Sequence, residues 1–424
     1  MNSGKSCEPY DDLERMSLEE REKYYDEKVA WVVDYAYHHV PAMKARLSKA
    51  GAVPNTIKGV KDLERIPPIT KSELAQAQKV DPPYGGFLAI SPEEQQFIHL
   101  GPGGNYEVSP LTEAVARTLH GIGFRKRDIV VNTFNQNLFW GGMAHTLAFN
   151  RLGVTVIPAG PGNSELLLRV FREIKVTGYF GTGNFLLSLM RRAKEIGLDP
   201  SQDFSLRLAG HSGEMLAASG KRELKEDYGI ETSETYGHED LGQVAYECSY
   251  GCGMHICEEF FVEIVDPATG KRMKPGEVGE IVVTCLANKV YPLIRFATGD
   301  LSCLIDEPCL CGRTSPRLSR IMGRVGDVTK ARGMFIYPND LKEVASGFPE
   351  ISNIQLLIDQ KEYKDRLSLN VEAETKGIAT DKLTEALQKA IKEKCNVRVD
   401  EVNYLTPGAI PKGSKVVLDR RTWK

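Results

Sequence analysis

The sequence lacks any run of the roughly 20 uninterrupted apolar residues that a transmembrane helix needs. Its N-terminal segment, MNSGKSCEPYDDLERMS, has no apolar core of signal-peptide length. An excess of either charge is also lacking, because 57 Asp and Glu offset 54 Lys and Arg to leave a formal net charge of −3. We therefore expect a cytoplasmic protein with small-molecule partners and no nucleic-acid or membrane partner. The oligomeric state, monomer or homodimer, stays open.

Disulfide bonds are not expected either, because a chain of 424 residues can bury a large core without such cross-links. Nine cysteines are nevertheless present, and seven of them lie between Cys248 and Cys311. This uneven distribution indicates a local cause in that part of the chain.

The apolar pattern predicts an α/β fold. Residues 17–51 have helical apolar spacing and end at a glycine. From about Arg127, short apolar strands alternate with amphipathic helices, which predicts a mainly parallel sheet covered by helices. After Tyr236 the period becomes two, and FFVEIVD and EIVVTCL, joined by a Pro- and Gly-rich turn, predict a β-hairpin in a β-rich subdomain.

The last hundred residues read as a separate α+β unit after a stretch in which glycines accumulate, RIMGRVGDVTKARG. We therefore predict a large N-terminal domain of helix-covered sheets plus the β-rich subdomain, residues 1–322. A small C-terminal domain, residues 327–424, is predicted to follow a hinge near residues 323–327.

Several ordered motifs resemble those of the phenylacetate–CoA ligases, namely ETYGHEDLG, DPATGKRMKPGEVGEIVVT, YPLIRFATGDL, CLCGRTSPRLSRIMGRVGD and YLTPGAIPKGSK. The resemblance to this family, part of the acyl-adenylate-forming (AMP-forming acyl-CoA synthetase) superfamily, covers the whole chain. It implies an acid–thiol ligase in which a carboxylic acid attacks the α-phosphorus of ATP to give acyl-AMP and pyrophosphate, and coenzyme A then displaces AMP. It also implies that the small α+β C-terminal domain is a mobile lid that rotates between the two steps.

The resemblance assigns the adenine side of a nucleotide site. A turn whose backbone lies against adenine matches Gly213, Glu214 and Met215. A glycine there lets the main chain approach a flat ring closely. The motif of the adenine-stacking tyrosine matches Glu234, Tyr236 and Gly237.

Ribose and phosphate contacts follow in the same way. Asp240 matches the acid that positions Mg²⁺, a hard cation that prefers oxygen ligands. Its neighbour Glu239 stands where the family has a hydroxyl, and this anion would repel phosphate. Asp300 matches the ribose-binding aspartate, and Arg324 matches an arginine that reaches ribose or phosphate. As an alternative, the acids near residue 240 only cap a helix.

The segment from Gly101 to Val108 matches the family's phosphate loop but lacks its hydroxyls and its lysine. Pro102 removes an amide donor and Glu107 adds negative charge. The amides of Gly103, Gly104 and Asn105 could still form an anion nest. Otherwise the segment is a plain turn over a site for AMP or a ligand other than ATP.

A lysine near the C-terminus stabilises charge on the α-phosphate in the family, an electrostatic role suited to a flexible cation. The segment GAIPKGSKVVLD offers Lys412 and Lys415. We predict Lys415 as the catalytic residue, with Lys412 as the alternative.

The clustered cysteines predict structural zinc, because Cys-x-Cys plus a Cys/His pair from a separate turn supplies four soft ligands. Related phenylacetate–CoA ligases show similar elements. The predicted ligands are Cys248, His255, Cys309 and Cys311, with Cys252 as the substitute. Reduced thiols without metal are the alternative.

The resemblance also places the acid pocket near FNQNLFWGG. Its predicted residues are Phe139, Trp140, Gly141 and His238. Aromatic walls suit an aryl acid, although core packing explains aromatics equally well. The leading hypothesis is thus an AMP-forming carboxylate–CoA ligase for an aromatic acid, with ATP, Mg²⁺ and coenzyme A as cofactors. The alternatives are an adenylyltransferase that forms no thioester and a non-catalytic nucleotide- or acyl-CoA-binding relative.

Overall fold

The computed structural model describes residues 8–101, 105–108, 112–327, 329–332, 334–361, 364–374 and 380–421. The chain divides into two compact units, residues 1–216 with 220–320, and residues 321–424 with 217–219. The main division therefore falls after Arg320, two residues before the predicted end of the N-terminal domain. The hinge near residues 323–327 stays a prediction.

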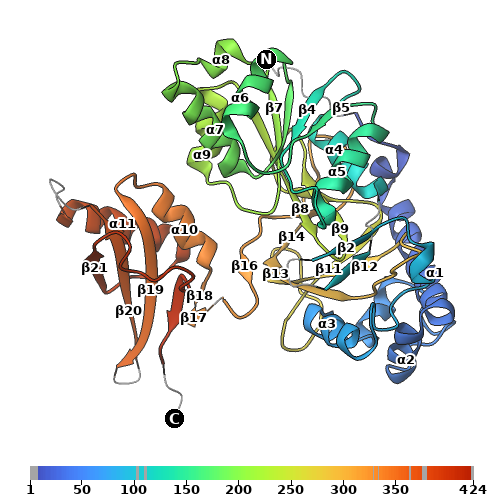
Figure 1. The fold of residues 1–424 in the computed structure, drawn as a ribbon. Helices are drawn as coiled ribbons and strands as arrows, with labels where there is room; N and C mark the ends of the chain where they lie inside the picture. The colour runs from blue at the N-terminus through green and yellow to red at the C-terminus, as the bar shows by residue number, and fades with distance from the viewer. Residues whose placement is uncertain are drawn as a thin grey trace. The chain divides into compact units, whose positions relative to one another are not determined.

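A nine-stranded sheet forms the centre of the first unit (Figure 1). Its parallel part has the order β5 (Thr155–Pro158), β4 (Ile129–Asn132), β6 (Gly178–Gly181), β7 (Leu208–His211) and β8 (Glu231–His238). It continues in antiparallel pairs through β9 (Gly242–Glu247), β10 (Met254–Ile256), β15 (Arg317–Leu318) and β14 (Leu304–Ile305). The predicted parallel sheet is confirmed.

Helices cover both faces of the parallel strands, as Figure 1 shows. One face carries α4 (Thr112–Ile122) and α5 (Trp140–Arg151), and the other carries α6 (Ser164–Glu173), α7 (Gly183–Glu195) and α9 (Ala218–Glu226), with the short α8 (Pro200–Asp203). Helix α7 buries Leu186, Met190 and Ala193, which recur at the helical period. These side chains join one core with strands β6 and β7.

A second sheet of the first unit has the order β1 (Ile69–Thr70), β13 (Phe296–Ser302), β12 (Gly279–Cys285) and β11 (Phe260–Val265). Strands β11 and β12 pair antiparallel from Phe260 with Cys285 to Val265 with Glu280, so the predicted hairpin is confirmed.

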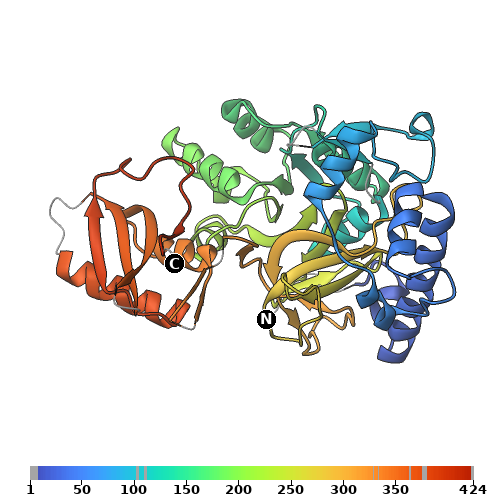
Figure 2. The same cartoon turned by 90° about the horizontal axis from the view of Figure 1, so that it is seen from below.

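The N-terminal helices and one small hairpin complete this unit. They are η1 (Asp12–Arg15), α1 (Leu18–His39), α2 (Pro41–Lys49), η2 (Val60–Arg65), α3 (Lys71–Val80), η3 (Pro92–Glu94), and the strands β2 (Ile98–Leu100) and β3 (Tyr106–Val108). Helices α1 and α2, blue in Figure 2, pack side by side. The chain breaks between them because Pro41 has no N–H to continue α1 and instead occupies the first turn of α2.

The second unit has a four-stranded sheet of order β21 (Glu401–Leu405), β20 (Lys364–Ala373), β19 (Ile351–Lys361) and β22 (Val417–Asp419). Helices α10 (Pro338–Ser346) and α11 (Thr380–Cys395) pack with it in one core, and β16 (Gly323–Arg324), β17 (Thr329–Ala331) and β18 (Met334–Ile336) precede them.

Within the described ranges of either unit, no helix has the length and apolar character needed to cross a membrane. The cytoplasmic location stays a prediction.

Candidate active site

A cavity of about 300 Å³ lies at the carboxyl ends of the parallel strands β4, β7 and β8. Phe134 and Asn135 follow β4, Ser212 follows β7, and Gly237 lies near the end of β8. Ligands of open α/β sheets bind outside the carboxyl ends of the strands. The position of this cavity is therefore that of a substrate site.

All four residues predicted for the acid pocket, Phe139, Trp140, Gly141 and His238, line this cavity. The Trp140 ring is buried and lies 4.6 Å from the His99 ring and 5.6 Å from the Phe97 ring, between ring centroids. His238 lies beside Phe296 with a ring-centroid distance of 4.9 Å. The cavity wall is thus mainly apolar, with aromatic surface from Phe134, Phe139 and Trp140.

Tyr236 and Asp300, predicted for adenine and ribose, are hydrogen-bonded to each other. The Tyr236 hydroxyl donates to Asp300 Oδ2 over 3.0 Å. The two residues lie on β8 and β13, which belong to different sheets, so only the fold brings them together. The bond fixes the ring and the carboxylate beside the cavity that Gly237 lines.

Glu214 and Glu234, predicted for the adenine side of the site, each contact a neighbouring helix. Gly213 has φ +81°, a conformation that favours glycine. Glu214 Oε1 accepts a hydrogen bond from the Asn184 amide, at 3.0 Å, near the start of α7. Glu234 Oε2 lies 3.4 Å from Lys221 Nζ. Both carboxylates therefore have structural partners, and Met215 follows as a half-buried residue.

Four charged side chains gather where the phosphates are predicted to bind. Lys71 forms an ion pair with Glu239. A Cβ on Gly101 would lie 2.3 Å from Glu107 Oε1 and 3.2 Å from Glu239 Oε2, so these two acids flank the same short segment. Asp240 is close enough to raise the pKa of Glu107 electrostatically.

Burial dominates the protonation of two of these acids. It raises the pKa of Glu107 to about 7, and the charge of Asp240 adds to the rise while Lys71 opposes it. Burial also raises the pKa of Asp240 to about 6, again against Lys71. Asp240 Oδ2 and Glu107 Oε1 are buried and have no hydrogen-bond partner among the described residues. Glu107 Oε1 is therefore available to a cation, and so is Asp240 Oδ2, which lies 3.5 Å from His238 Nδ1.

The predicted phosphate loop is described only at its two ends. The Gly101 amide donates to the Asn105 carbonyl over 2.8 Å and closes the turn between β2 and β3. Pro102, Gly103 and Gly104 lie outside the described residues, so the predicted anion nest stays a prediction. Gln78 of α3 bonds the amide and the carbonyl of Tyr106, which ties the helix that begins at Lys71 to this hairpin.

The predicted catalytic lysine belongs to the second unit. Lys415 Nζ lies 3.2 Å from Asp327 Oδ1 and donates to the Gly326 carbonyl over 3.2 Å, both in the predicted hinge. Gly326 has φ +86°. Lys412 and Arg324 are exposed on the same unit. The predicted catalytic lysine and the predicted hinge are therefore in direct contact.

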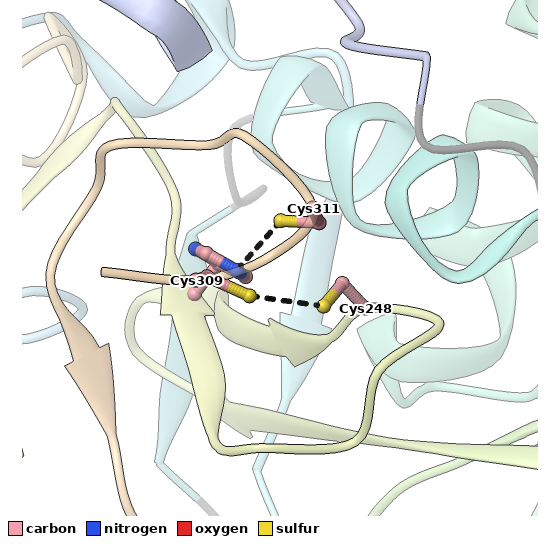
Figure 3. A group of neighbouring side chains, drawn as sticks. Cys248, Cys309 and Cys311 are labelled. Atoms are coloured by element: carbon pink, nitrogen blue, oxygen red, sulfur yellow. Dashed lines mark hydrogen bonds between the residues drawn. The ribbon is translucent and has the colours of Figure 1, made fainter. Parts of the chain in front are cut away.

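The four predicted zinc ligands come together from three segments (Figure 3). Cys248 follows β9, His255 lies on β10, and Cys309 and Cys311 lie in the loop before β15. Their ligand atoms all lie within 4.8 Å of one another, with 3.7 Å from Cys248 Sγ to Cys309 Sγ and 3.3 Å from Cys311 Sγ to His255 Nε2. Tetrahedral zinc with Zn–S bonds of about 2.3 Å separates two sulfurs by about 3.8 Å.

Cys252 lies beside this cluster, with its Sγ 3.6 Å from Cys309 Sγ, but it is exposed and belongs to no compact group of four ligands among the described residues. His255 Nδ1 lies 3.2 Å from Ser315 Oγ, a contact that orients the ring. Hydrogen bonds from Cys248 and then from His255 lower the pKa of the Cys311 thiol. Cys311 is thus favoured as the thiolate, the form that binds metal, while the same contacts and burial raise the pKa values of Cys248 and Cys309.

Two family models match the chain, "AMP-binding enzyme" over residues 109–285 and "AMP-binding enzyme C-terminal domain" over residues 333–421. Curated phenylacetate–coenzyme A ligases are also similar. The one from Thermus thermophilus is 29% identical over 97% of this chain and 99% of its own length. The one from Escherichia coli is 29% identical over 95% of this chain and 94% of its own. The chain belongs to the AMP-binding enzymes and is similar over nearly its whole length to phenylacetate–CoA ligases. It is an AMP-forming acid–CoA ligase.

Solved structures agree with this assignment. A 2-hydroxyisobutyryl-CoA ligase in the postadenylation state, in complex with an acyl-AMP, has a TM-score of 0.84 at 25% identity, over 99% of this ligase and 94% of that chain. The same enzyme in the thioesterification state, with 2-HIB-AMP and CoA, has a TM-score of 0.71 at 25% identity, over 97% and 92% of the two chains. The predicted family, fold class and reaction class are confirmed.

The sequence analysis missed two side chains of this ligase's site. Lys71 lies 30 residues before the predicted phosphate loop and outside every motif of the resemblance, and only its place at a helix start, in ITKSELAQ, is visible in the sequence. Gln243 lines the cavity from β9. A polar residue in the buried strand GQVAYE is a signal that could have revealed it.

Proposed function

We propose that this ligase activates a compact, mainly apolar or aryl carboxylic acid held in the cavity between Phe134, Phe139 and Trp140. The aromatic lining carries this proposal, because flat apolar surface binds an aryl group by burial and by ring stacking. The curated relatives are named for phenylacetate and the structural neighbour for 2-hydroxyisobutyrate. Both acids are small enough for a cavity of about 300 Å³.

The hydrogen-bonded pair of Tyr236 and Asp300 supports a nucleotide site at the mouth of this cavity. The tyrosine ring offers a face for adenine, and the carboxylate can accept hydrogen bonds from ribose hydroxyls. The acid carboxylate and the α-phosphorus would then meet near Gly237, where cavity and nucleotide face adjoin. Holding the two reactants together supplies much of the rate enhancement.

Asp240 and Glu107 fit a Mg²⁺ ion, because each has a buried carboxylate oxygen without a hydrogen-bond partner among the described residues. When bound, Mg²⁺ neutralises phosphate charge. Burial raises the pKa of both acids, with the charge of Asp240 adding to the rise at Glu107, so a bound cation would stabilise their charged forms.

Lys71 replaces the charge that the altered phosphate loop lacks. Its ammonium group already lies against Glu239. Glu239 in turn lies beside Gly101, which follows strand β2 of the β2–β3 hairpin. We expect Lys71→Ala to raise the KM for ATP by about 10- to 100-fold, the cost of losing a charge-assisted hydrogen bond of about 1.5–3 kcal/mol. Lys71→Arg should keep most of the affinity. Steady-state kinetics at saturating acid measure both, and an unchanged KM in Lys71→Ala contradicts the role.

The cysteine cluster is proposed as a structural zinc site. Its four protein ligands complete a tetrahedron and leave no position for substrate.

The second unit is proposed as a lid that turns about residues 323–327, where Gly326 permits large changes of backbone angles.

The function is tested by acid-dependent ATP–pyrophosphate exchange over a panel of aryl and small branched acids, followed by thioester detection with CoA. We expect exchange and a thioester with at least one acid. Exchange without a thioester would identify an adenylyltransferase, and neither product would favour a non-catalytic relative. Asp300→Asn is the matched variant, expected to weaken ATP binding while the fold remains.

A further inference from the structure

The proposed acid pocket contains a hydrogen-bonded pair that fixes the orientation of one amide. His145 lies on α5 and Gln243 on β9, and both line the cavity. The distance from Gln243 Nε2 to His145 Nε2 is 2.9 Å, and both side chains are buried. The two nitrogen atoms can be joined only if one donates and the other accepts.

The backbone decides which nitrogen of His145 carries the proton. His145 Nδ1 lies 2.5 Å from the Gly141 carbonyl oxygen, which can only accept, so Nδ1 is the donor. Burial lowers the pKa of His145 to about 4, which keeps the ring neutral near pH 7. Nε2 therefore accepts, and the amide NH₂ of Gln243 must donate to it.

Gln243 Oε1 consequently points away from His145 and is left as an acceptor. It is buried and has no hydrogen-bond partner among the described residues. It lies 3.1 Å from the point that a Cβ on Gly237 would occupy, and Gly237 also lines the cavity. The ladder between β8 and β9 shifts register at Gly237, which faces Gln243. Because Gly237 has no side chain, no Cβ covers the acceptor at this point, which also lies 2.9 Å from the Gly242 carbonyl oxygen.

A buried acceptor without a partner selects ligands. Water can satisfy it in an empty pocket, but an acid that displaces this water must replace its hydrogen bond or lose affinity. A methyl group placed there leaves the amide oxygen unsatisfied, which costs roughly 1–3 kcal/mol, or about 5- to 150-fold.

We propose that Gln243 selects acids whose side group carries a hydrogen-bond donor, a hydroxyl or an amino group, that reaches its Oε1. The inference rests on the proposed function of this cavity, since it names the class of acid that the ligase prefers. His145 acts as the positioning residue that holds the amide in this orientation. The purely apolar aryl acid is then a poorer substrate than its hydroxylated or amino relative.

The experiment compares matched acids that differ only in this group. The pairs are 2-, 3- and 4-hydroxyphenylacetate against the corresponding methylphenylacetates, 4-aminophenylacetate against 4-methylphenylacetate, mandelate against 2-phenylpropionate, and 2-hydroxyisobutyrate against pivalate. Acid-dependent pyrophosphate release gives kcat/KM for each. We expect the donor-bearing acid of at least one pair to be favoured by about 10- to 100-fold. Equal or better use of the methyl analogue in every pair overturns the inference.

Gln243→Leu provides the second arm. We expect the preference to fall below about threefold, with the methyl analogue used as well as before or better, because the lost acceptor no longer needs a partner. A preference that persists in this variant also overturns the inference. The pairs measured on the unaltered ligase decide the question even if the variant fails to fold. Pyrophosphate release with none of the acids would instead reject the proposed function, so the two failures are distinguishable.

Discussion

Lys415→Ala should lower the rate of adenylation by about 10²- to 10³-fold, the usual effect of removing one group that stabilises transition-state charge. Charge develops on the α-phosphate in this step, and the phosphate loop supplies no lysine of its own between Gly101 and Val108. A flexible ammonium group from the second unit can deliver the missing charge. ATP–pyrophosphate exchange at saturating acid measures the loss.

The contacts of Lys415 are suited to this role. Its partners in the structure are Asp327 and the Gly326 carbonyl, and its side chain is largely exposed. An exposed ion pair contributes only about 0.2–1 kcal/mol, so exchange of Asp327 for a phosphate costs little. Because the partners lie in the predicted hinge, release of the lysine and rotation of the lid can occur together.

Lys412→Ala is the matched control, since it lies three residues away in the same loop and is exposed. It should change the exchange rate by less than about twofold, the size expected for a surface lysine without a specific contact. A large loss in Lys412→Ala with normal exchange in Lys415→Ala would move the catalytic role to Lys412. Normal exchange in both variants would show that neither lysine acts in adenylation. Thioester formation from prepared acyl-AMP should be nearly unchanged in Lys415→Ala.

The fold was predictable because local patterns agree with the tertiary structure. The strand RDIVVNTF and the helix FLLSLMRRAKEIG have the periods of a buried strand and an amphipathic helix, and both form as expected. The break at Pro41 was not predicted, although proline cannot continue a helix and the residue stands in the sequence. Such features depend on neighbours in sequence, which the sequence displays directly.

The site was only partly predictable, because several of its contacts depend on tertiary structure. Tyr236 and Asp300 were found through motifs, but their hydrogen bond joins two sheets. Lys71 reaches Glu239 because the capped start of α3 lies beside the turn between β8 and β9. The orientation of the Gln243 amide depends on a carbonyl in α5. None of these relations leaves a periodic signal in the sequence.

Loss of one zinc ligand should destabilise the first unit well beyond the cluster itself. We expect Cys309→Ser to bind less than about 0.1 zinc per chain, compared with about one in the unaltered protein, because a three-ligand site lacks the fourth bond of a structural tetrahedron. The melting temperature should fall by about 10 °C, which corresponds to several kcal/mol in a unit of this size. Metal analysis and calorimetry measure the two effects.

The destabilisation follows from the residues next to the ligands. Arg313, two residues after Cys311, donates to Glu14 Oε2 over 2.8 Å, and the Thr314 amide donates to the Glu14 carbonyl over 2.9 Å. Glu14 is almost completely buried and also accepts from the Tyr246 hydroxyl at 2.8 Å. Release of the Cys-x-Cys loop would therefore separate buried charges from their partners, which costs about 3–5 kcal/mol.

Cys252→Ser is the matched control, because Cys252 lies 3.6 Å from Cys309 yet belongs to no compact group of four ligands. This variant should retain about one zinc and lose less than about 2 °C. Hydrogen exchange adds a spatial readout, since Cys309→Ser should expose the amides of residues 12–21 while α7 stays protected. Full zinc content in Cys309→Ser, or equal zinc loss in Cys252→Ser, would contradict the ligand set. Unchanged exchange at residues 12–21 in a zinc-free variant would show that the N-terminal segment is held independently of the metal.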